Sequence, residues 1–131
     1  MASIFSRIVA GEIPCHKIAE NDKFLAFLDV NPRTEGHTLV IPKKEIDYLF
    51  DIDDEMLGRM VIFAKSIARA IEKAIPCKRI ALMVIGLEVP HAHIHLIPIR
   101  KECDLLPSKL KWKKSSEELA RIAELIRAQL T

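Results

Sequence analysis

Three histidines alternate with small and apolar residues in the segment His91-Ala92-His93-Ile94-His95. Alternate side chains of a β-strand point to the same face, so this spacing predicts three imidazoles side by side. The intervening apolar side chains would then face the core. We therefore expect a strand over residues 91–99, and we expect its three histidines to titrate as a coupled group.

Two kinds of chemistry use imidazoles in this arrangement, and the spacing alone leaves both open. Neutral imidazoles are good zinc or copper ligands, so the cluster is compatible with a metal site. Alternatively, one imidazole attacks an electrophile while its neighbours hold its tautomer and donate protons. A purely structural role is the least favoured interpretation, because it would require three histidines to occur by chance on the same face of one strand.

A fourth histidine stands just before another apolar run, in Gly36-His37-Thr38-Leu39-Val40-Ile41-Pro42. The run 38–41 predicts a short buried strand that ends at the proline. We expect this strand to lie beside the histidine strand and to bring His37 close to the cluster. Only Glu88 and Glu102 are acidic residues near the histidine strand in the chain, so a mixed carboxylate–histidine metal site is poorly supplied.

The composition excludes several classes of protein. The chain has 131 residues, of which 50% are hydrophobic and 29% are charged, with a net charge of +2. This near balance gives no reason to expect nucleic acid as the partner. We find no apolar run that would span a membrane and no secretory signal at the N-terminus. The three cysteines show no paired spacing and are interpreted as reduced thiols, so we expect a cytoplasmic protein.

The remaining elements predict an α+β fold: a mainly antiparallel sheet with one long central helix and a C-terminal helix. A short helix that Ser3 can cap is expected at 4–10, and short strands are expected at 18–20 and 24–28. A long amphipathic helix begins near 51–54 and ends before Pro76, and the apolar run 79–85 predicts a central strand. The last helix begins at Ser115 with a capping box to Glu118. The segment 102–114, which contains Trp112, suits a tail across the core or a subunit contact.

Four segments together resemble the histidine triad (HIT) family, in its branch of small nucleotide-binding hydrolases. They are residues 3–14, 24–32, 36–42 and the histidine segment 91–97. The resemblance covers about residues 3–98 and implies a HIT-like fold. We therefore interpret residues 1–131 as a single HIT domain, with a C-terminal tail and helix at 99–131.

The resemblance implies a role for each histidine. His93 would attack the α-phosphorus and form a nucleotidyl-histidine intermediate, which water then hydrolyses. His95 would bind phosphate oxygens and protonate the leaving group, while His91 would orient His93. His37 would contribute to the phosphate site. A neutral imidazole suits this chemistry near neutral pH, because its unperturbed pKa is about 6.5.

The resemblance also implies a nucleotide site next to the histidines. Asp29 would bind the ribose hydroxyls as a hydrogen-bond acceptor. An apolar slot for the purine would be formed by Phe5, Ile8, Ile13, Phe27 and Val30, positions that suit the core almost as well. The implied partner is a purine nucleotide such as AMP or GMP, and no cofactor is expected. Family members are commonly homodimers.

Two departures from the family pattern bear on activity. Leu87 stands where many relatives have a glutamine that hydrogen-bonds the phosphate, and Glu88 would repel a phosphate dianion. Some relatives bind zinc through a Cys-x-x-Cys pair, whereas Ser3 and Ser6 occupy those positions here, so we predict no metal there. We expect a hydrolase of nucleoside phosphoramidates or related nucleotidyl conjugates. The alternatives are a nucleotide-binding module with little turnover and a protein that binds metal through the three histidines.

Overall fold

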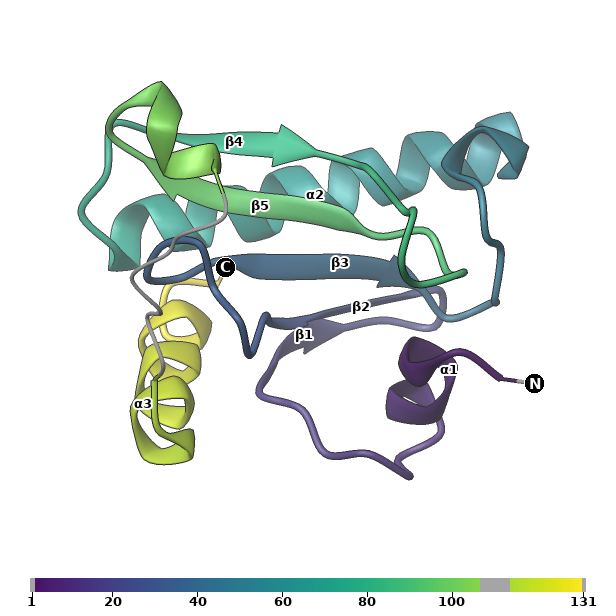
Figure 1. Cartoon of the computed structure of the whole chain (residues 1–131), viewed down its shortest axis with the longest axis horizontal. Coiled ribbons are helices and arrows are strands. Elements are labelled where there is room, and N and C mark those ends of the chain that lie inside the picture. The colour runs from purple at the N-terminus through teal and green to yellow at the C-terminus, as the bar shows by residue number, and fades with distance from the viewer. Residues whose placement is uncertain (1, 107–113, 131) are drawn as a thin grey trace.

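A five-stranded antiparallel sheet forms the centre of the computed structural model, which describes residues 2–106 and 114–130 (Figure 1). The strand order is β1-β2-β3-β5-β4, and every neighbouring pair is antiparallel. The strands are β1 (Lys17–Glu20), β2 (Phe24–Leu28), β3 (Thr38–Pro42), β4 (Arg79–Met83) and β5 (Ile94–Ile99). The predicted α+β class with a mainly antiparallel sheet is confirmed.

Helices cover the two faces of the sheet unequally. The long helix α2 (Asp54–Ala74) and the C-terminal helix α3 (Ser116–Arg127) pack on one face, where they share a core with β1, β2, β3 and β5. The short helix α1 (Ile4–Val9) lies against the opposite face through Phe5, beside alternate residues of β2 and β3. All residues of β2 and β3 are therefore buried, which explains their continuous apolar sequences.

Capping residues fix the N-terminal ends of all three α-helices that the structure describes, two of them at the residues that the sequence predicts. Ser3 caps α1 by accepting a hydrogen bond from the Ser6 amide, and Asp53 caps α2 in the same way. Ser115 and Glu118 form the predicted capping box of α3. Two short 3-10 helices, Leu49–Asp51 and Glu102–Leu105, complete the regular structure of the described residues.

The loop between β2 and β3 depends on a glycine. Gly36 has φ +91°, a conformation that L-residues with a side chain rarely adopt. A Cβ atom there would lie 3.0 Å from Ile75 Cγ1 and 3.3 Å from Pro98 Cγ. This close approach lets the loop turn tightly against the sheet, so that His37 enters β3 beside β5.

The predicted strand over 91–99 is too long at its start, because β5 begins at Ile94. The Ala92 amide donates to the Ile46 carbonyl and the His91 amide to the Val89 carbonyl, so neither joins the sheet ladder. The predicted alternation nevertheless holds. Ala92, Ile94 and Leu96 lie in the core shared with α2.

The prediction of a central strand at 79–85 is wrong. β4 lies at the edge of the sheet and ends at Met83. Leu82 and Ile85 are 54% and 50% exposed, so this apolar run does not reflect burial on both faces of the sheet. An apolar sequence alone does not distinguish a central strand from an edge strand that another surface covers.

The C-terminal part of the chain is described on either side of residues 107–113. Glu102–Leu105 forms the second 3-10 helix, and α3 contributes Leu119, Ile122 and Ile126 to the core. Trp112 and most of the predicted tail or subunit contact at 102–114 lie outside the described residues. Within the described ranges, no helix is long and apolar enough to cross a membrane.

Candidate active site

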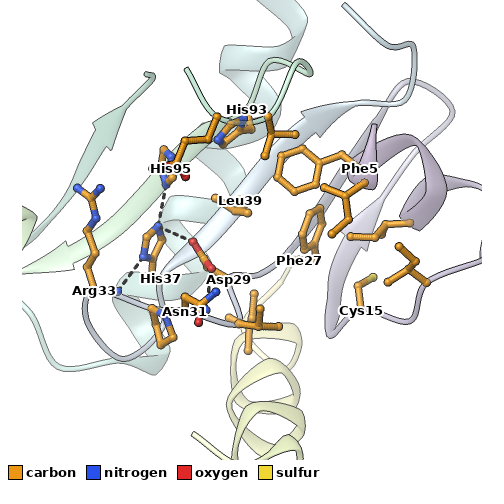
Figure 2. Close-up of a pocket in the computed structure, with 18 of the residues that line it drawn as sticks. Phe5, Cys15, Phe27, Asp29, Asn31, Arg33, His37, Leu39, His93 and His95 are labelled. Atoms are coloured by element: carbon orange, nitrogen blue, oxygen red, sulfur yellow. Dashed lines mark hydrogen bonds and ion pairs between the residues drawn. The ribbon is translucent and has the colours of Figure 1, made fainter. Parts of the chain in front are cut away.

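A cavity of about 720 Å³ opens between α1, the β2–β3 loop and the segment before β5 (Figure 2). Nine of the ten residues predicted for the site line it: Phe5, Ile8, Ile13, Phe27, Asp29, Val30, His37, His93 and His95. The tenth, His91, is fully buried and lies outside the lining. Residues far apart in the sequence are thus gathered into one site.

Aromatic rings form the apolar end of the cavity. Phe5 and Phe27 pack edge to face, with their ring centroids 5.7 Å apart. Phe5 also contacts the His93 ring edge to face at 4.9 Å. A flat apolar group that enters between α1 and β2 would therefore lie beside His93, which is the arrangement that a bound nucleobase needs.

The tautomer of His93 follows from its backbone contact. His93 Nδ1 lies 2.8 Å from the His91 carbonyl oxygen, which can only accept a hydrogen bond. Nδ1 must therefore carry the proton, and in the neutral ring Nε2 keeps its lone pair. His93 is 7% exposed and lines the cavity, so this lone pair belongs to a nearly buried side chain at the cavity wall.

His37 and His95 form a directed pair behind His93. The Arg33 amide donates to His37 Nδ1 at 3.0 Å, so the His37 proton is on Nε2. This Nε2–H lies 2.9 Å from His95 Nδ1 and donates to it, which places the His95 proton on Nε2. Burial lowers the pKa of His37 to about 3 and that of His95 to about 4, so both rings are neutral at neutral pH. The expected pairing of the two strands, and the approach of His37, are confirmed.

His91 is held from both sides behind the cavity wall. Its Nε2 donates to the Pro42 carbonyl at 2.7 Å, and its Nδ1 accepts from the Ser3 hydroxyl at 2.9 Å. Glu45 Oε1 accepts hydrogen bonds from the Ser3 amide at 2.6 Å and the Ser6 hydroxyl at 2.7 Å. These bonds keep the pKa of Glu45 at about 2. The two serines therefore join α1 to His91 through hydrogen bonds.

Asp29, expected from the resemblance as a ribose-binding residue, also brings a carboxylate into contact range of the histidines. Asp29 Oδ2 lies 3.6 Å from His37 Nε2, and ligand atoms of Asp29, His37 and His95 all lie within 4.8 Å of one another. Burial raises the pKa of Asp29. The sequence predicts a poor supply of carboxylates when only residues near the histidines in the chain are considered. That prediction is wrong, because Asp29, which directly follows β2, lies beside His37 and His95 in the fold.

The hydrogen bonds of this group nevertheless disfavour a metal ion. A metal at His37 Nε2 would need the proton on Nδ1, but Nδ1 already accepts from the Arg33 amide. His95 Nδ1 is likewise occupied by the His37 Nε2 proton. The pair is arranged for proton donation into the cavity rather than for metal ligation.

Several cavity residues escaped the sequence analysis. Arg33 and Asn31 from the β2–β3 loop, Leu39 from β3 and Val89 also line the cavity. Arg33 directly follows the family-like segment 24–32 and stands four residues before His37, which is the signal that could have identified it. Leu87 is 89% exposed and is not among the lining residues, whereas Glu88 lines the cavity mouth.

Comparison with known proteins places this geometry in context. The family model of the HIT domain matches residues 10–102. An adenosine 5′-monophosphoramidase of Schizosaccharomyces pombe is 34% identical, and the match covers 99% of both chains. An adenylylsulfatase of Arabidopsis thaliana is 35% identical over 92% of this chain and 63% of its own length.

A solved structure agrees with the fold. The HIT-like protein of Bartonella henselae, described as involved in cell-cycle regulation, superposes with a TM-score of 0.86 at 34% identity. The superposition covers 98% of this chain and 96% of the other. The HIT-like fold expected from the four sequence segments is therefore confirmed.

Proposed function

This chain belongs to the HIT domain family, and on that premise we propose that it is a nucleotide hydrolase with a nucleotidyl-histidine intermediate. Its substrates are purine nucleoside phosphoramidates or related nucleotidyl conjugates. The names of two relatives, a monophosphoramidase and an adenylylsulfatase, support the reaction class. Residues 1–131 act as a single domain, because α3 shares the core of the sheet that carries the site.

One observation carries the assignment of the nucleophile. In the described part of the chain, the hydrogen bonds of His37, His91 and His95 use the lone pair of each ring. Among these four histidines, only His93 presents an unengaged ring lone pair, at Nε2, because its Nδ1 proton is held by the His91 carbonyl. His93 is therefore the nucleophile of this site, and His91 orients it.

The bonds and protons balance across two steps. In the first, the His93 Nε2 lone pair forms a bond to the α-phosphorus, and the bond from phosphorus to the leaving nitrogen breaks. The nitrogen keeps the electron pair and takes a proton from a water molecule, to which the Nε2–H of His95 donates a hydrogen bond. The positive charge on the His93 ring, whose centroid lies 4.9 Å from that of His95, stabilises the hydroxide that remains.

In the second step, this hydroxide attacks the phosphorus and the bond to His93 breaks. The electron pair returns to His93 Nε2, and the ring is neutral again. The His37 Nε2–H stabilises His95 throughout, because it donates to His95 Nδ1 at 2.9 Å. The products are a nucleoside monophosphate and an amine.

The rest of the cavity suits the nucleoside. The Asn31 amide holds Asp29 Oδ1 at 2.8 Å, so the carboxylate has a fixed orientation and Oδ2 faces the histidines. Such an acceptor binds ribose hydroxyls. The base lies in the slot formed by Phe5, Ile8, Ile13, Phe27 and Val30.

The first test is AMP release from adenosine 5′-phosphoramidate, with and without EDTA. Wild-type protein is expected to release AMP in both conditions, and His93→Ala to lower the rate by at least about 10³-fold, as removal of a nucleophile does. Rapid quenching in base, which the acid-labile P–N bond survives, should trap an adenylyl group on the peptide that contains His93. His16→Ala is the matched control, since His16 is a histidine outside the cavity. Equal loss in both variants, or loss with EDTA, would contradict the proposal.

Leu87 favours a second candidate function, a nucleotide-binding module with little turnover. Its exposed apolar side chain supplies no hydrogen bond to a phosphate, and Glu88 places a carboxylate at the cavity mouth. AMP binding by calorimetry, without AMP release from the phosphoramidate, would favour this candidate. Release at a substantial rate would eliminate it.

A second copy of the chain is the proposed protein partner. In the described residues β4 pairs with β5 alone, so its outer edge carries backbone groups open to another strand. Leu82 on this strand is 54% exposed, and Ile62 on the adjacent helix α2 is 70% exposed. A two-fold pairing of β4 with its copy would satisfy these groups and cover the apolar residues.

A further inference from the structure

The permanent positive charge of the cavity comes from a single side chain among the described residues. Arg33 is the only lysine or arginine among the described residues that line it. His37 and His95 are neutral at neutral pH, because burial lowers the pKa of each. The two acidic lining residues are Asp29 and Glu88. Any anionic substrate group beyond the α-phosphate therefore has one permanent positive charge available in this part of the chain.

Arg33 lies at the histidine end of the cavity rather than at the nucleobase end. Figure 2 shows its side chain extending from the β2–β3 loop toward the level of His95, on the side away from Phe5 and Phe27. Its Nη1 donates to the Leu105 carbonyl and lies 3.9 Å from Met83 Sδ. Met83 is paired with His95 across β4 and β5, so these contacts place the guanidinium near His95.

The guanidinium retains hydrogen-bonding capacity in this position. Arginine has five N–H donors in a planar fork, and the side-chain hydrogen bonds of Arg33 within the described residues use only Nη1. Nε and Nη2 remain to bind two oxygens of one acidic group, which is the geometry that guanidinium groups favour. Leu105 and Met83 hold the fork in place, so less side-chain entropy is lost on binding.

From this arrangement we propose that Arg33 binds an acidic leaving group, so that this site selects nucleotidyl conjugates of sulfate, phosphate or a carboxylate. The inference rests on the proposed function and names its substrate class. In such a conjugate the nucleobase occupies the Phe5–Phe27 end and the α-phosphate faces His93. The leaving group then extends past His95 toward Arg33.

An acidic leaving group also changes the demand for protons. When His93 Nε2 forms its bond to the α-phosphorus of a nucleotidyl sulfate, the bond from phosphorus to the bridging oxygen breaks. Sulfate departs with the electron pair and needs no proton, because it is a very weak base. Arg33 stabilises the negative charge that develops on the departing oxygens. The water that then hydrolyses the intermediate releases its proton to solvent, and the electron pair of the broken bond returns to His93 Nε2.

The kinetic test compares two leaving groups on the same nucleotide. We expect Arg33→Gln to lower kcat/KM for adenosine 5′-phosphosulfate by roughly 10- to 100-fold, the effect of losing a charge-assisted hydrogen bond. The loss for adenosine 5′-phosphoramidate, whose leaving group is not acidic, should be at least about tenfold smaller. Arg33→Lys should lose less than Arg33→Gln, because it keeps the charge but not the fork.

Two features of the design protect its interpretation. The hydrogen bond to His37 comes from the Arg33 backbone amide, so all three side chains at position 33 preserve it. Arg59→Gln is the matched control, because Arg59 is an exposed arginine of α2 outside the cavity. Equal losses on both substrates, or no loss on the phosphosulfate, would overturn the proposal.

A binding measurement separates this inference from the proposed reaction. Calorimetry with His93→Ala protein should show tighter binding of adenosine 5′-phosphosulfate than of AMP, and Arg33→Gln in that background should remove the difference. This result would support the role of Arg33 even if wild-type protein cleaves neither conjugate. The absence of cleavage would refute the hydrolase assignment but not the role of Arg33 in binding. Equal affinities for both ligands before the substitution would refute the role of Arg33.

Discussion

His37 determines how protons are arranged at the site. Its Nδ1 is fixed by a backbone amide and its Nε2 proton points at His95, so the ring is held in one tautomer. The groups around it are His95, His93, Arg33 and Asp29, and burial outweighs the single negative charge among them. The ring consequently stays neutral under conditions in which an exposed histidine binds a proton.

The low pKa of His37 predicts acid sensitivity of the fold. Its pKa is about 3 in the folded protein, against an ordinary value of 6.5. Between these values the unfolded chain binds a proton that the folded chain does not, so stability falls as pH decreases from about 6.5. The contribution is about 1.4 kcal/mol per pH unit for one fully shifted group.

Urea unfolding at pH 7, 6 and 5 measures this effect. His37→Asn is expected to be less stable than wild type at pH 7, yet to lose stability with acidification less steeply by about 1 kcal/mol per pH unit. The slope rather than the absolute stability tests the prediction. Parallel slopes for the two proteins would show that His37 titrates normally in the fold.

At the residue scale the sequence indicates which side chains meet, but not how their protons lie. Alternation and the four family-like segments are sufficient to select His37, His93, His95 and Asp29 for the cavity. The tautomers depend on contacts with backbone groups such as the Arg33 amide and the His91 carbonyl. No pattern of residue types reports those contacts, because they follow from loop geometry.

At the scale of elements, α1 is attached to the histidine segment by hydrogen bonds. Ser3 both caps α1 and donates to His91 Nδ1, and Glu45 fixes the Ser3 amide and the Ser6 hydroxyl. His91 in turn presents its carbonyl to His93 Nδ1. The position of the short helix is therefore coupled to the orientation of the proposed nucleophile.

Ser3→Ala is expected to weaken both functions of this contact. The loss of the cap costs about 1 kcal/mol, and His91 Nδ1 left without its short hydrogen bond adds about 1 kcal/mol or more. Because His93 would be less well oriented, kcat for adenosine 5′-phosphoramidate should fall several-fold while KM changes little. Ser3→Thr keeps the hydroxyl and should preserve most of the stability and most of the kcat. A loss of stability without a loss of kcat would limit Ser3 to capping.

The elements themselves could be predicted where local signals and burial agree. The caps at Ser3 and Ser115 and the buried runs of β2 and β3 were identified from sequence. The position of β4 in the sheet was predicted wrongly. The apolar sequence 79–85 indicates that the strand is covered, but it does not indicate whether a neighbouring strand, a helix or another molecule covers it. The first residues of the expected strand at 91–99 leave the ladder because Ala92 bonds to Ile46, a contact between segments far apart in the chain.

At the scale of the whole molecule, one face of the sheet is closed by the chain's own helices and the other by the site. Helices α2 and α3 bury one face, whereas α1 and the cavity occupy the other. The remaining exposed apolar surface includes the β4 edge and its neighbour α2, where Leu82, Ile85 and Ile62 are exposed. This distribution is the reason to expect that a second copy binds at this edge.

Basic residues flank the same edge and modify that expectation. Lys65, Arg69, Lys78 and Arg79 lie together between α2 and β4, with Glu72 as the acidic residue among them. A two-fold pairing of β4 strands brings two such groups toward each other, and their repulsion opposes the apolar contact. Since salt screens exposed charges, the proposed dimer should be tighter at high ionic strength than at low.

Sedimentation equilibrium of wild-type protein should therefore give twice the chain mass of 14.9 kDa, with a dissociation constant that decreases as salt is added. Leu82→Glu places a charge in the proposed contact and should shift the protein to monomer, because a buried unpaired charge is costly. Leu125→Glu is the matched control, since Leu125 is an exposed leucine on α3, away from β4. Cavity residues are unchanged in both variants, so AMP release serves as a check on folding. A monomeric wild type, or a dimer that persists in Leu82→Glu, would mean that β4 is not the contact and that its exposed apolar residues have another cause.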